Sequence, residues 1–163
     1  MIAIRRAGLD DFDLIWPLLQ PVFVAGDTYA VDPLITKEAA MALWMDQPVA
    51  TYLAEIDGQI VATYYLKTNQ QGGGAHICNC GYVVGAAARG KGIAAQLCLH
   101  SQDEARRLGY RAMQFNFVLA SNAGAVRLWH KLGFDTVGTI PDAFDHPEHG
   151  CVDAYVMHKS LTD

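Results

Sequence analysis

Short apolar stretches, several of them rich in β-branched and aromatic residues, recur along the chain and predict β-strands. Asp57-Gly58 separates two of these stretches, and this dipeptide between strands is a strong signal for a hairpin. A further turn is expected at Gly72-Gly73-Gly74. The predicted strands cover residues 2–6, 49–56, 59–67, 75–84, 111–118, 134–140 and 151–158.

Longer stretches, with apolar residues at helical spacing or with helix start and stop signals, predict four helices between these strands. Asp10 suits the N-cap of the first helix, and Gly109 and Gly133 follow the last two helices, where left-handed caps are common. The order of elements predicts an α/β domain with two helices after the first strand. The predicted helices cover residues 10–22, 36–45, 90–108 and 121–132, with loops at 26–33 and 142–150.

The composition is that of a folded domain. Of the 163 residues, 52% are hydrophobic and 18% are charged, which excludes disorder and suits one domain over residues 1–163. No apolar run is long enough to span a membrane, and residues 1–6 acquire charge too early for a signal peptide, so we expect a soluble, cytoplasmic protein. The net charge of -5 argues against nucleic acid as a partner.

The cysteines and histidines do not form a recognisable metal motif. Cys78 and Cys80 alternate along a predicted strand with His76 on the same face, but the spacing of zinc ligands is absent. We therefore expect reduced thiols and no metal site.

A glycine-rich basic cluster, Arg89-Gly90-Lys91-Gly92-Ile93-Ala94, lies between a predicted strand and a predicted helix. Glycines let backbone approach a ligand closely, and the free N–H groups and positive dipole end of a helix start favour an anion. The cluster can thus hold a pyrophosphate, although an ordinary strand-to-helix turn with exposed basic residues would have the same sequence. Neither the P-loop pattern nor the dinucleotide fingerprint is present.

Two motifs carry a family resemblance. Arg89, Gly92 and Ala94 match [RQ]-x-x-G-x-[GA], and residues 122–134 end in Leu-Gly-Phe, as in motifs A and B of the GNAT acyltransferases. The order and spacing of both motifs resemble that superfamily over nearly the whole chain. The resemblance implies the GNAT fold, a twisted, mixed and mostly antiparallel sheet of six to seven strands with about four helices, whose fourth and fifth strands splay apart to admit coenzyme A.

The resemblance also implies roles for individual residues. Arg89 to Ala94 would hold the pyrophosphate of acetyl-CoA, and the strand before them and the helix after Asn122 would contact its pantetheine arm. Catalytic roles are expected for Val84, Asn79 and Asn122, with backbone N–H groups of the fourth strand stabilising the oxyanion. The expected cofactor-binding residues are Tyr82, Val83, Val84, Arg89, Gly90, Lys91, Gly92, Ile93, Ala94, Asn122 and Trp129.

The chain departs from the family pattern at two positions. Trp129 stands where many members have a tyrosine that is proposed to protonate the leaving thiolate, and an indole N–H is no useful acid. Trp129 is therefore expected to pack. Residues 76–82 contain no carboxylate to act as general base, which favours an α-amino group of pKa about 8 over a lysine amine of pKa about 10.4.

Several polar residues are candidates for binding the acceptor. Asn79 is unusual in mid-strand, so it either contacts the substrate or braces the splayed strand. Asn116 raises the same two alternatives. His146 in the last predicted loop has a ring that could serve as a general base. The expected substrate-binding residues are Asp27, Thr28, Tyr29, Asn79, Asn116 and His146.

The sequence thus predicts an acetyl-CoA-dependent N-acetyltransferase in which a small, amino-acid-like amine attacks the thioester directly. The resemblance is compatible with a homodimer. Two alternatives stay open: an enzyme that acetylates protein or peptide N-termini, and a non-catalytic CoA-binding regulatory domain.

Overall fold

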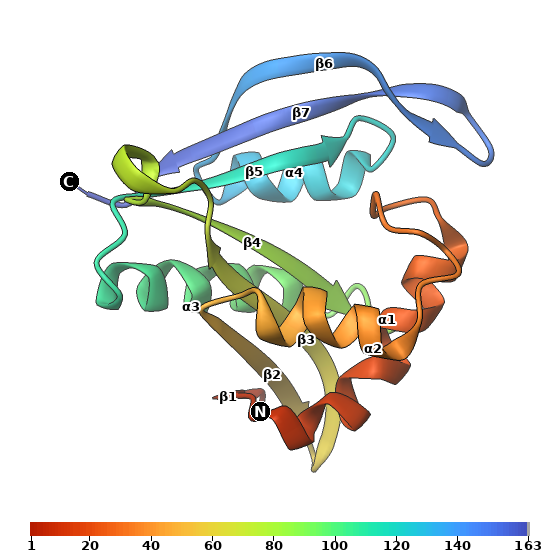
Figure 1. Ribbon diagram of the computed structural model, residues 1–163, viewed down its shortest axis with the longest axis vertical. Helices are drawn as coiled ribbons and strands as arrows, with labels where there is room; N and C mark the ends of the chain where they lie inside the picture. The colour runs from red at the N-terminus through yellow and green to blue at the C-terminus, as the bar shows by residue number, and fades with distance from the viewer. Residues whose placement is uncertain (163) are drawn as a thin grey trace.

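The computed structural model describes residues 1–162 and is built on one seven-stranded sheet (Figure 1). The strand order is β1-β2-β3-β4-β5-β7-β6, and every neighbouring pair is antiparallel except β4 and β5, which are parallel. This confirms the mixed, mostly antiparallel sheet that the family resemblance implies. The strands are β1 (Ala3–Arg6), β2 (Ala50–Ile56), β3 (Gln59–Thr68), β4 (Ile77–Val84), β5 (Ala112–Leu119), β6 (Asp135–His146) and β7 (Gly150–Ser160).

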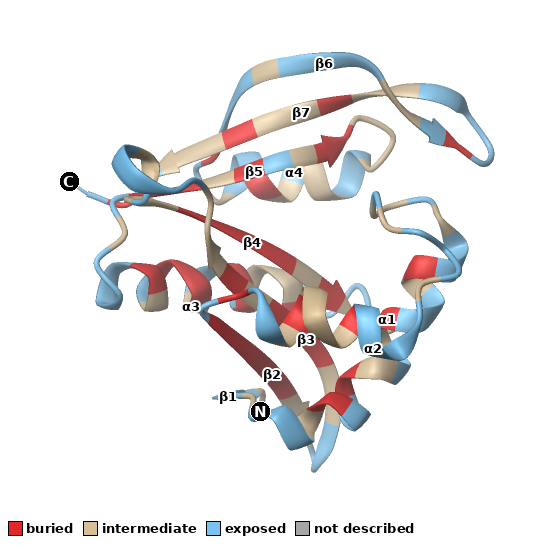
Figure 2. Ribbon diagram, in the orientation of Figure 1, coloured by how far each residue is buried: buried red, intermediate tan, exposed pale blue. Residues whose placement is uncertain are grey.

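The helices cover both faces of the sheet, and each face has its own core. Along β2, along β3 from Ala62 onward and along β4, the even-numbered side chains pack in the core with α3 and α4, whereas odd-numbered ones such as Leu53 and Val83 pack in the core with α1 and α2. Figure 2 shows that burial is concentrated on β2 to β5, while β6 at the edge is largely exposed. The helices are α1 (Phe12–Ala25), α2 (Lys37–Met41), which continues into a π-helical turn (Ala42–Asp46), α3 (Ile93–Arg107) and α4 (Ala123–Lys131).

Most predicted elements are confirmed, including the Asp57-Gly58 hairpin, whose two turn residues have φ of +50° and +78°. Positive φ at both positions is the conformation that a type I′ turn requires. The prediction that Asp10 caps the first helix is wrong. Residues Leu9–Asp11 form a 3-10 turn, and the carboxylate of Asp11 accepts a hydrogen bond from Gly8 N–H while it pairs with Arg5.

The predicted loop over residues 142–150 is also wrong for the most part. β6 continues to His146 and pairs with β7 down to the register His146↔Gly150, which leaves only residues 147–149 as the turn. A register shift between Ile140 and Phe144 carries the strand past Pro141, a residue that interrupts strand patterns because it lacks an N–H donor.

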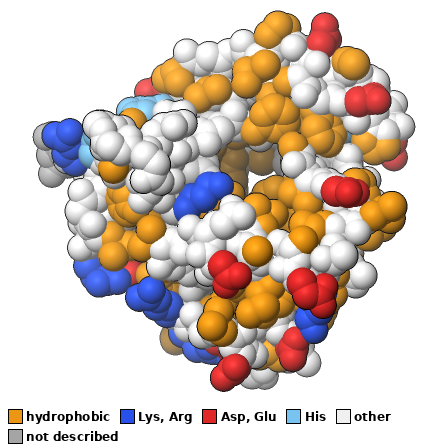
Figure 3. All heavy atoms as spheres, in the orientation of Figure 1, with side chains coloured by type: hydrophobic (Ala, Val, Ile, Leu, Met, Phe, Trp, Pro, Cys, Tyr) orange, Lys and Arg blue, Asp and Glu red, His pale blue; other side chains and the backbone are white. Residues whose placement is uncertain are grey.

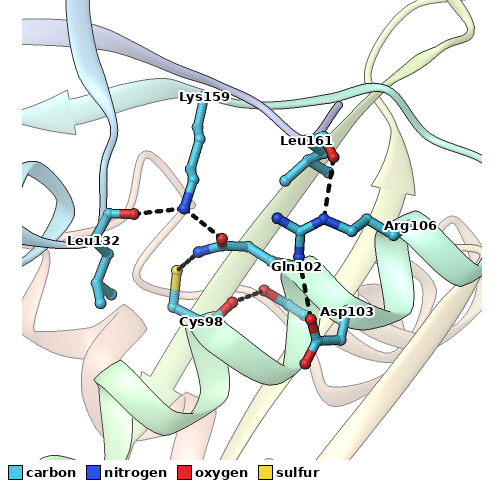
Figure 4. Close-up of polar contacts among 8 residues, drawn as sticks. Cys98, Gln102, Asp103, Arg106, Leu132, Lys159 and Leu161 are labelled. Carbon is cyan, nitrogen blue, oxygen red and sulfur yellow. Dashed lines mark hydrogen bonds and ion pairs between the residues drawn. The ribbon is translucent and has the colours of Figure 1, made fainter. Parts of the chain in front are cut away.

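A half-buried lysine fixes α4 and α3 against β7 (Figure 4). Lys159 Nζ donates to the Leu132 carbonyl oxygen at 2.8 Å and to Gln102 Oε1 at 2.7 Å. Leu132 is the C-cap of α4, so the cation lies at the negative end of the helix dipole. Arg106 Nε adds a bond to the Leu161 carbonyl oxygen at 3.1 Å. These contacts set the position of α4, which lines the cavities described below.

No helix in the described part of the chain is both long and apolar enough to cross a membrane. Nor do residues 1–162 contain a group of three or more His, Cys, Asp or Glu side chains placed to hold a metal ion. The four cysteines are free thiols, and only Cys151 is exposed.

A network of charged and polar side chains joins β2 to α3 on the face of the sheet that α3 covers. The Tyr52 hydroxyl donates to Glu104 Oε2 at 2.6 Å, and Arg107 binds the same carboxylate with a closest N–O distance of 2.6 Å. Hydrogen bonds from Arg107 and then from Tyr52 lower the pKa of Glu104 from 4.5 to about 2. The ionised carboxylate is therefore favoured in the folded protein.

We predict that Glu104→Gln makes the stability of the protein less dependent on pH in the acid range. Because the folded pKa of Glu104 lies below its ordinary value, its contribution is complete above about pH 5 and is lost as the pH falls toward 2. Between pH 6 and pH 3 the free energy of unfolding of the wild type should fall by about 1 to 2 kcal/mol more than that of the variant. Urea denaturation at both pH values measures this difference, and parallel pH profiles would contradict it.

Candidate functional site

The central feature of the site is an opening in the sheet between β4 and β5. These strands pair only at Ile77↔Ala112 and Cys78↔Met113. Beyond that point β4 stays paired with β3 as far as Val84, and β5 stays paired with β7 as far as Leu119. The two halves of the sheet therefore diverge, and one edge of β4 has no neighbouring strand.

The register of β3 and β4 shows which backbone groups face this opening. Hydrogen bonds from Gly85 N–H to Val61 O and from Asn69 N–H to Ile77 O set the alternation of the antiparallel ladder. By that alternation Val83 turns its N–H and C=O toward β3, whereas Tyr82 and Val84 turn theirs toward the opening. The Tyr29 hydroxyl confirms this direction, since it donates to the Tyr82 carbonyl oxygen at 2.8 Å.

A cavity of about 330 Å³, here called the aromatic cavity, lies at this opening on the side of α2. Figure 3 shows a hollow in the face that it draws, with hydrophobic side chains gathered around it. A bulge in β5 between Phe115 and Val118 brings five consecutive residues, from Phe115 to Leu119, into its wall. Its aromatic lining residues are Tyr29, Trp44, Tyr65, Tyr82, Phe115, Phe117 and Trp129.

A second cavity of about 620 Å³, here called the polar cavity, lies toward the carboxyl end of β4 and the end of α1. Its polar and charged lining residues include Asp27, Arg89, Ser121 and His146. The hydroxyl oxygen of Ser121 is buried there without a hydrogen-bond partner among the described residues. A buried unpaired hydroxyl in a cavity wall is a group that a polar ligand would satisfy.

Four of the predicted site residues line both cavities: Thr28, Tyr29, Tyr82 and Asn122. Asn122 caps α4, with its side-chain oxygen accepting from Ala125 N–H at 3.3 Å. The ring of Tyr29 is fixed by edge contacts with Phe23 and Trp44, and burial raises its pKa well above the usual value. The two cavities thus meet at the unpaired edge of β4.

The glycine-rich turn adjoins the polar cavity through Arg89. Gly90 and Gly92 have φ of +75° and +74°, a conformation that other residues adopt only with strain. Gly92 is the N-cap of α3 and supplies no capping side chain, so the first N–H groups of the helix stay available. Lys91 is exposed beside them, and Ile93 anchors the helix start in the core. Neither cavity is lined by Gly90 or by the four residues that follow it.

The structure shows a bracing contact for Asn79. Its Nδ2 donates to the Gln114 carbonyl oxygen on β5 at 2.9 Å, just beyond the last backbone pair of β4 and β5. The Tyr65 hydroxyl lies 3.4 Å from Asn79 Oδ1. The side chain therefore spans the start of the opening and also lines the aromatic cavity. Asn116 lines the same cavity, and its amide donates to Asn69 Oδ1 at 2.7 Å.

Trp129 packs, as the sequence analysis expects. Its ring centroid lies 5.0 Å from that of Phe115 and 5.3 Å from that of Tyr82. The Tyr82 hydroxyl is turned to α3, where it bonds Ser101 Oγ at 2.7 Å. Burial raises the pKa of Tyr82 well above its usual value, so this hydroxyl is a weak acid directed away from the opening.

His146 lies on the side of the polar cavity, not the aromatic one. Its Nδ1 accepts a hydrogen bond from Glu148 N–H at 3.1 Å, and its ring stacks on His149 with centroids 4.4 Å apart. With Nδ1 occupied as an acceptor, the neutral tautomer carries its proton on Nε2. In this arrangement the Nδ1 lone pair is already bonded to the backbone.

Sequence reasoning missed several residues of the aromatic cavity, of which Tyr65 is the most informative. A Cβ atom at Gly81 would lie 2.6 Å from Tyr65 Cε1, so the glycine makes room for the ring. Burial raises the pKa of Tyr65 to about 12. The strand pattern over residues 59–67 places Tyr65 on one face, but only the register of β3 on β4 reveals that it crosses Gly81.

Comparison with known proteins gives consistent results. Residues 12–134 match a family model described as the acetyltransferase (GNAT) family. The N-acetyltransferase aca1 of Schizosaccharomyces pombe is 37% identical over 109 residues, which are 66% of this chain and 52% of that protein. The chain thus spans about half the length of this curated relative.

Solved structures agree with the fold over the whole chain. A GCN5-related N-acetyltransferase from Kribbella flavida superposes with a TM-score of 0.92 at 41% identity and covers 98% of this chain and 97% of its own. The structure of yncA from Salmonella typhimurium with its cofactor acetyl-CoA has a TM-score of 0.86 at 21% identity, covers 100% of this chain and 95% of its own, and shows the same fold.

We predict that Asn79→Ala destabilises the protein, because it leaves the Gln114 carbonyl group unpaired at the start of the opening. Loss of a buried hydrogen bond of this kind costs about 1 to 3 kcal/mol in the free energy of unfolding. Thermal and urea unfolding of the variant measure the cost. Asn116→Ala is the matched control, since Asn116 is exposed and its loss should change stability by less than about 0.5 kcal/mol. If the two variants are equally stable, the Asn79 amide is not a brace.

Proposed function

Because the chain belongs to the GNAT family of acetyltransferases, we propose that it transfers an acetyl group from acetyl-CoA to the amine of a small, amino-acid-like molecule. The observation that carries this proposal is the meeting of the two cavities at the unpaired edge of β4. One cavity is polar and adjoins the glycine-rich helix start through Arg89, and the other is small and aromatic. This division suits the charged acetyl donor, acetyl-CoA, in the polar cavity and a compact amine, the acetyl acceptor, in the aromatic cavity.

The chain has groups that fit coenzyme A. The free N–H groups after Gly92, with Arg89 and Lys91 beside them, can bind a pyrophosphate without a metal. Ser121 has a buried hydroxyl that lacks a partner among the described residues. The cofactor would supply an activated acetyl thioester, and yncA binds acetyl-CoA on the same fold.

At the opening the protein contributes position and polarity. The backbone N–H groups of Tyr82 and Val84 are directed at the space between the strands, where they can donate to the carbonyl oxygen of the thioester. Tyr29, Asn122 and Trp129 would form the walls around it. Holding the amine and the thioester together in this space is itself a large part of the rate enhancement that such a reaction needs.

The acceptor should arrive as the free amine. None of the residues that line the aromatic cavity is a carboxylate that could remove a proton from an ammonium group. A substrate whose amine has a lowered pKa is neutral more often than a lysine side chain is. This supports a small α-amino compound over a protein lysine.

Acetylation of peptide or protein N-termini is the alternative within catalysis. It requires a groove that accepts extended chain, whereas the aromatic cavity has a volume of about 330 Å³ and is walled by Tyr29 from the α1–α2 connection and by Trp44 from the π-helical turn after α2. The size and the aromatic walls favour the small molecule.

An acceptor screen tests the proposal. Amino acids, their amides, simple amines and N-terminal peptides are offered with acetyl-CoA, and release of free CoA is followed. We expect turnover with small amino compounds and loss of acetyl-CoA binding in Gly92→Glu, which puts a negative charge at the anion cradle. Gly92→Ala is the control, because it shares the strain of φ +74° but adds no charge. Equal acetyl-CoA affinity of the two variants in titration calorimetry would refute the cradle assignment.

We predict that Trp129→Phe keeps most of the activity. Trp129 packs on Phe115 and Tyr82 and is proposed to donate no proton, so a smaller aromatic ring should cost only packing and positioning. The expected decrease in kcat is less than about tenfold, against the hundredfold or more that loss of a general acid causes. A decrease of about a thousandfold would show that the indole takes part in the chemistry.

A further inference from the structure

The aromatic cavity contains one charged side chain, that of Lys67 on β3, among the described residues that line it. Each of the five ion pairs formed within residues 1–162 joins other residues, so no carboxylate of this part of the chain lies within 4.0 Å of Lys67 Nζ. A cation without a protein partner in the wall of an otherwise uncharged cavity is free to bind an anion.

Local packing holds this cation toward the cavity. Lys67 Nζ lies 5.4 Å from the centroid of the Tyr65 ring, within the range of a cation–π interaction. Tyr65 in turn crosses Gly81 and makes an edge contact with Trp44, with centroids 4.8 Å apart. The ring that steadies the ammonium is thus itself fixed by the core.

The residue opposite Lys67 on the neighbouring strand has an amide side chain. Lys67 is paired with Asn79 across β3 and β4, and both side chains therefore lie on the same face. The Lys67 ammonium reaches the Tyr65 ring, and that ring lies over Gly81, the residue immediately before Tyr82 on β4. An anionic group bound beside Lys67 would leave the rest of a small molecule extended toward the unpaired edge of β4.

We propose that Lys67 binds the carboxylate of the acceptor and makes the enzyme selective for amino acids over amines that lack the acid group. This inference rests on the proposed function for the identity of the reaction, but the anion site itself does not require turnover. The aromatic side chains around it would contact the apolar part of the substrate, and the amine would point to the opening. Lys67 is thereby assigned as a specificity-determining residue.

Matched pairs of acceptors isolate the contribution of the substrate carboxylate to kcat/KM. Alanine, valine, leucine, methionine and phenylalanine are compared with their primary amides, which keep the amine and the side chain and lose the negative charge. The wild type should have a kcat/KM at least ten times higher for the acid of the preferred pair. A neighbouring carboxylate raises the pKa of an amine, so the amine of the amide has the lower pKa and is unprotonated more often. A preference for the acid would therefore not be due to a more reactive amine.

Variants of Lys67 give the second comparison. Lys67→Gln should lower kcat/KM for the acid about ten- to a hundredfold, because it removes one charge-assisted hydrogen bond. The kcat/KM for the amide should change less than about threefold. Lys67→Arg should keep most of the selectivity because it keeps the charge. Equal losses on acid and amide, or a wild type that prefers the amide, would overturn the proposal.

A binding experiment distinguishes failure of this inference from failure of the proposed function. Trp44 and Trp129 line the cavity, so titration of the same acids and amides can be followed by tryptophan fluorescence without any turnover. If no amine is acetylated, the proposed function fails; the anion site then stands if acids bind the wild type more tightly than Lys67→Gln. Absence of acid binding, or equal binding to both proteins, refutes the anion site.

Discussion

The loss of hydrogen bonding between β4 and β5 is the constraint on which the rest of the site depends. A strand in the middle of a sheet is normally bonded on both sides, because a buried N–H or C=O without a partner is costly. Here the ladder stops after Cys78↔Met113, and the remaining length of β4 must satisfy its groups in another way. Tyr29 from the α1–α2 connection bonds the Tyr82 carbonyl oxygen of β4, and on the facing strand β5 the Gln114 carbonyl oxygen accepts a bond from the Asn79 side chain. The groups that stay unpaired are those available to a ligand.

Aromatic packing on the opposite face keeps the two halves of the sheet together despite this opening. The rings of Tyr52, Tyr64 and Tyr82 lie side by side across β2, β3 and β4, with centroids 4.7 and 5.7 Å apart. Tyr82 continues the row to Phe115 on β5 and Trp129 on α4. Large apolar side chains of the core thus connect β4 to β5 where backbone hydrogen bonds are missing. The unpaired backbone groups of β4 stay accessible at the opening. The same packing accounts for an indole at position 129, since the ring fills space that a smaller side chain would leave empty.

The parts that could be predicted from the sequence are those with local signals. The Asp57-Gly58 hairpin and the ends of the helices before Gly109 and Gly133 follow from the conformational preferences of a few residues. The position of Tyr65 over Gly81, and of Lys67 beside Asn79, depends on the register between two strands, which the alternation of one strand cannot specify. The length of β6 could not be predicted because Pro141 ordinarily ends a strand. In the structure a bulge allows β6 to continue past it.

The charge of the site also bears on how an amine could react without a general base. The whole chain has a net charge of -5, yet the charged side chain in the aromatic cavity is a cation, and Arg89 faces the polar cavity. A nearby positive charge disfavours the protonated form of an amine and lowers its pKa. In a free amino acid the substrate's own carboxylate has the opposite effect, and pairing of that carboxylate with Lys67 would cancel it. An anchor that neutralises the acid group would therefore raise the fraction of reactive amine at the opening, so that selectivity and activation of the acceptor would both depend on the same cation.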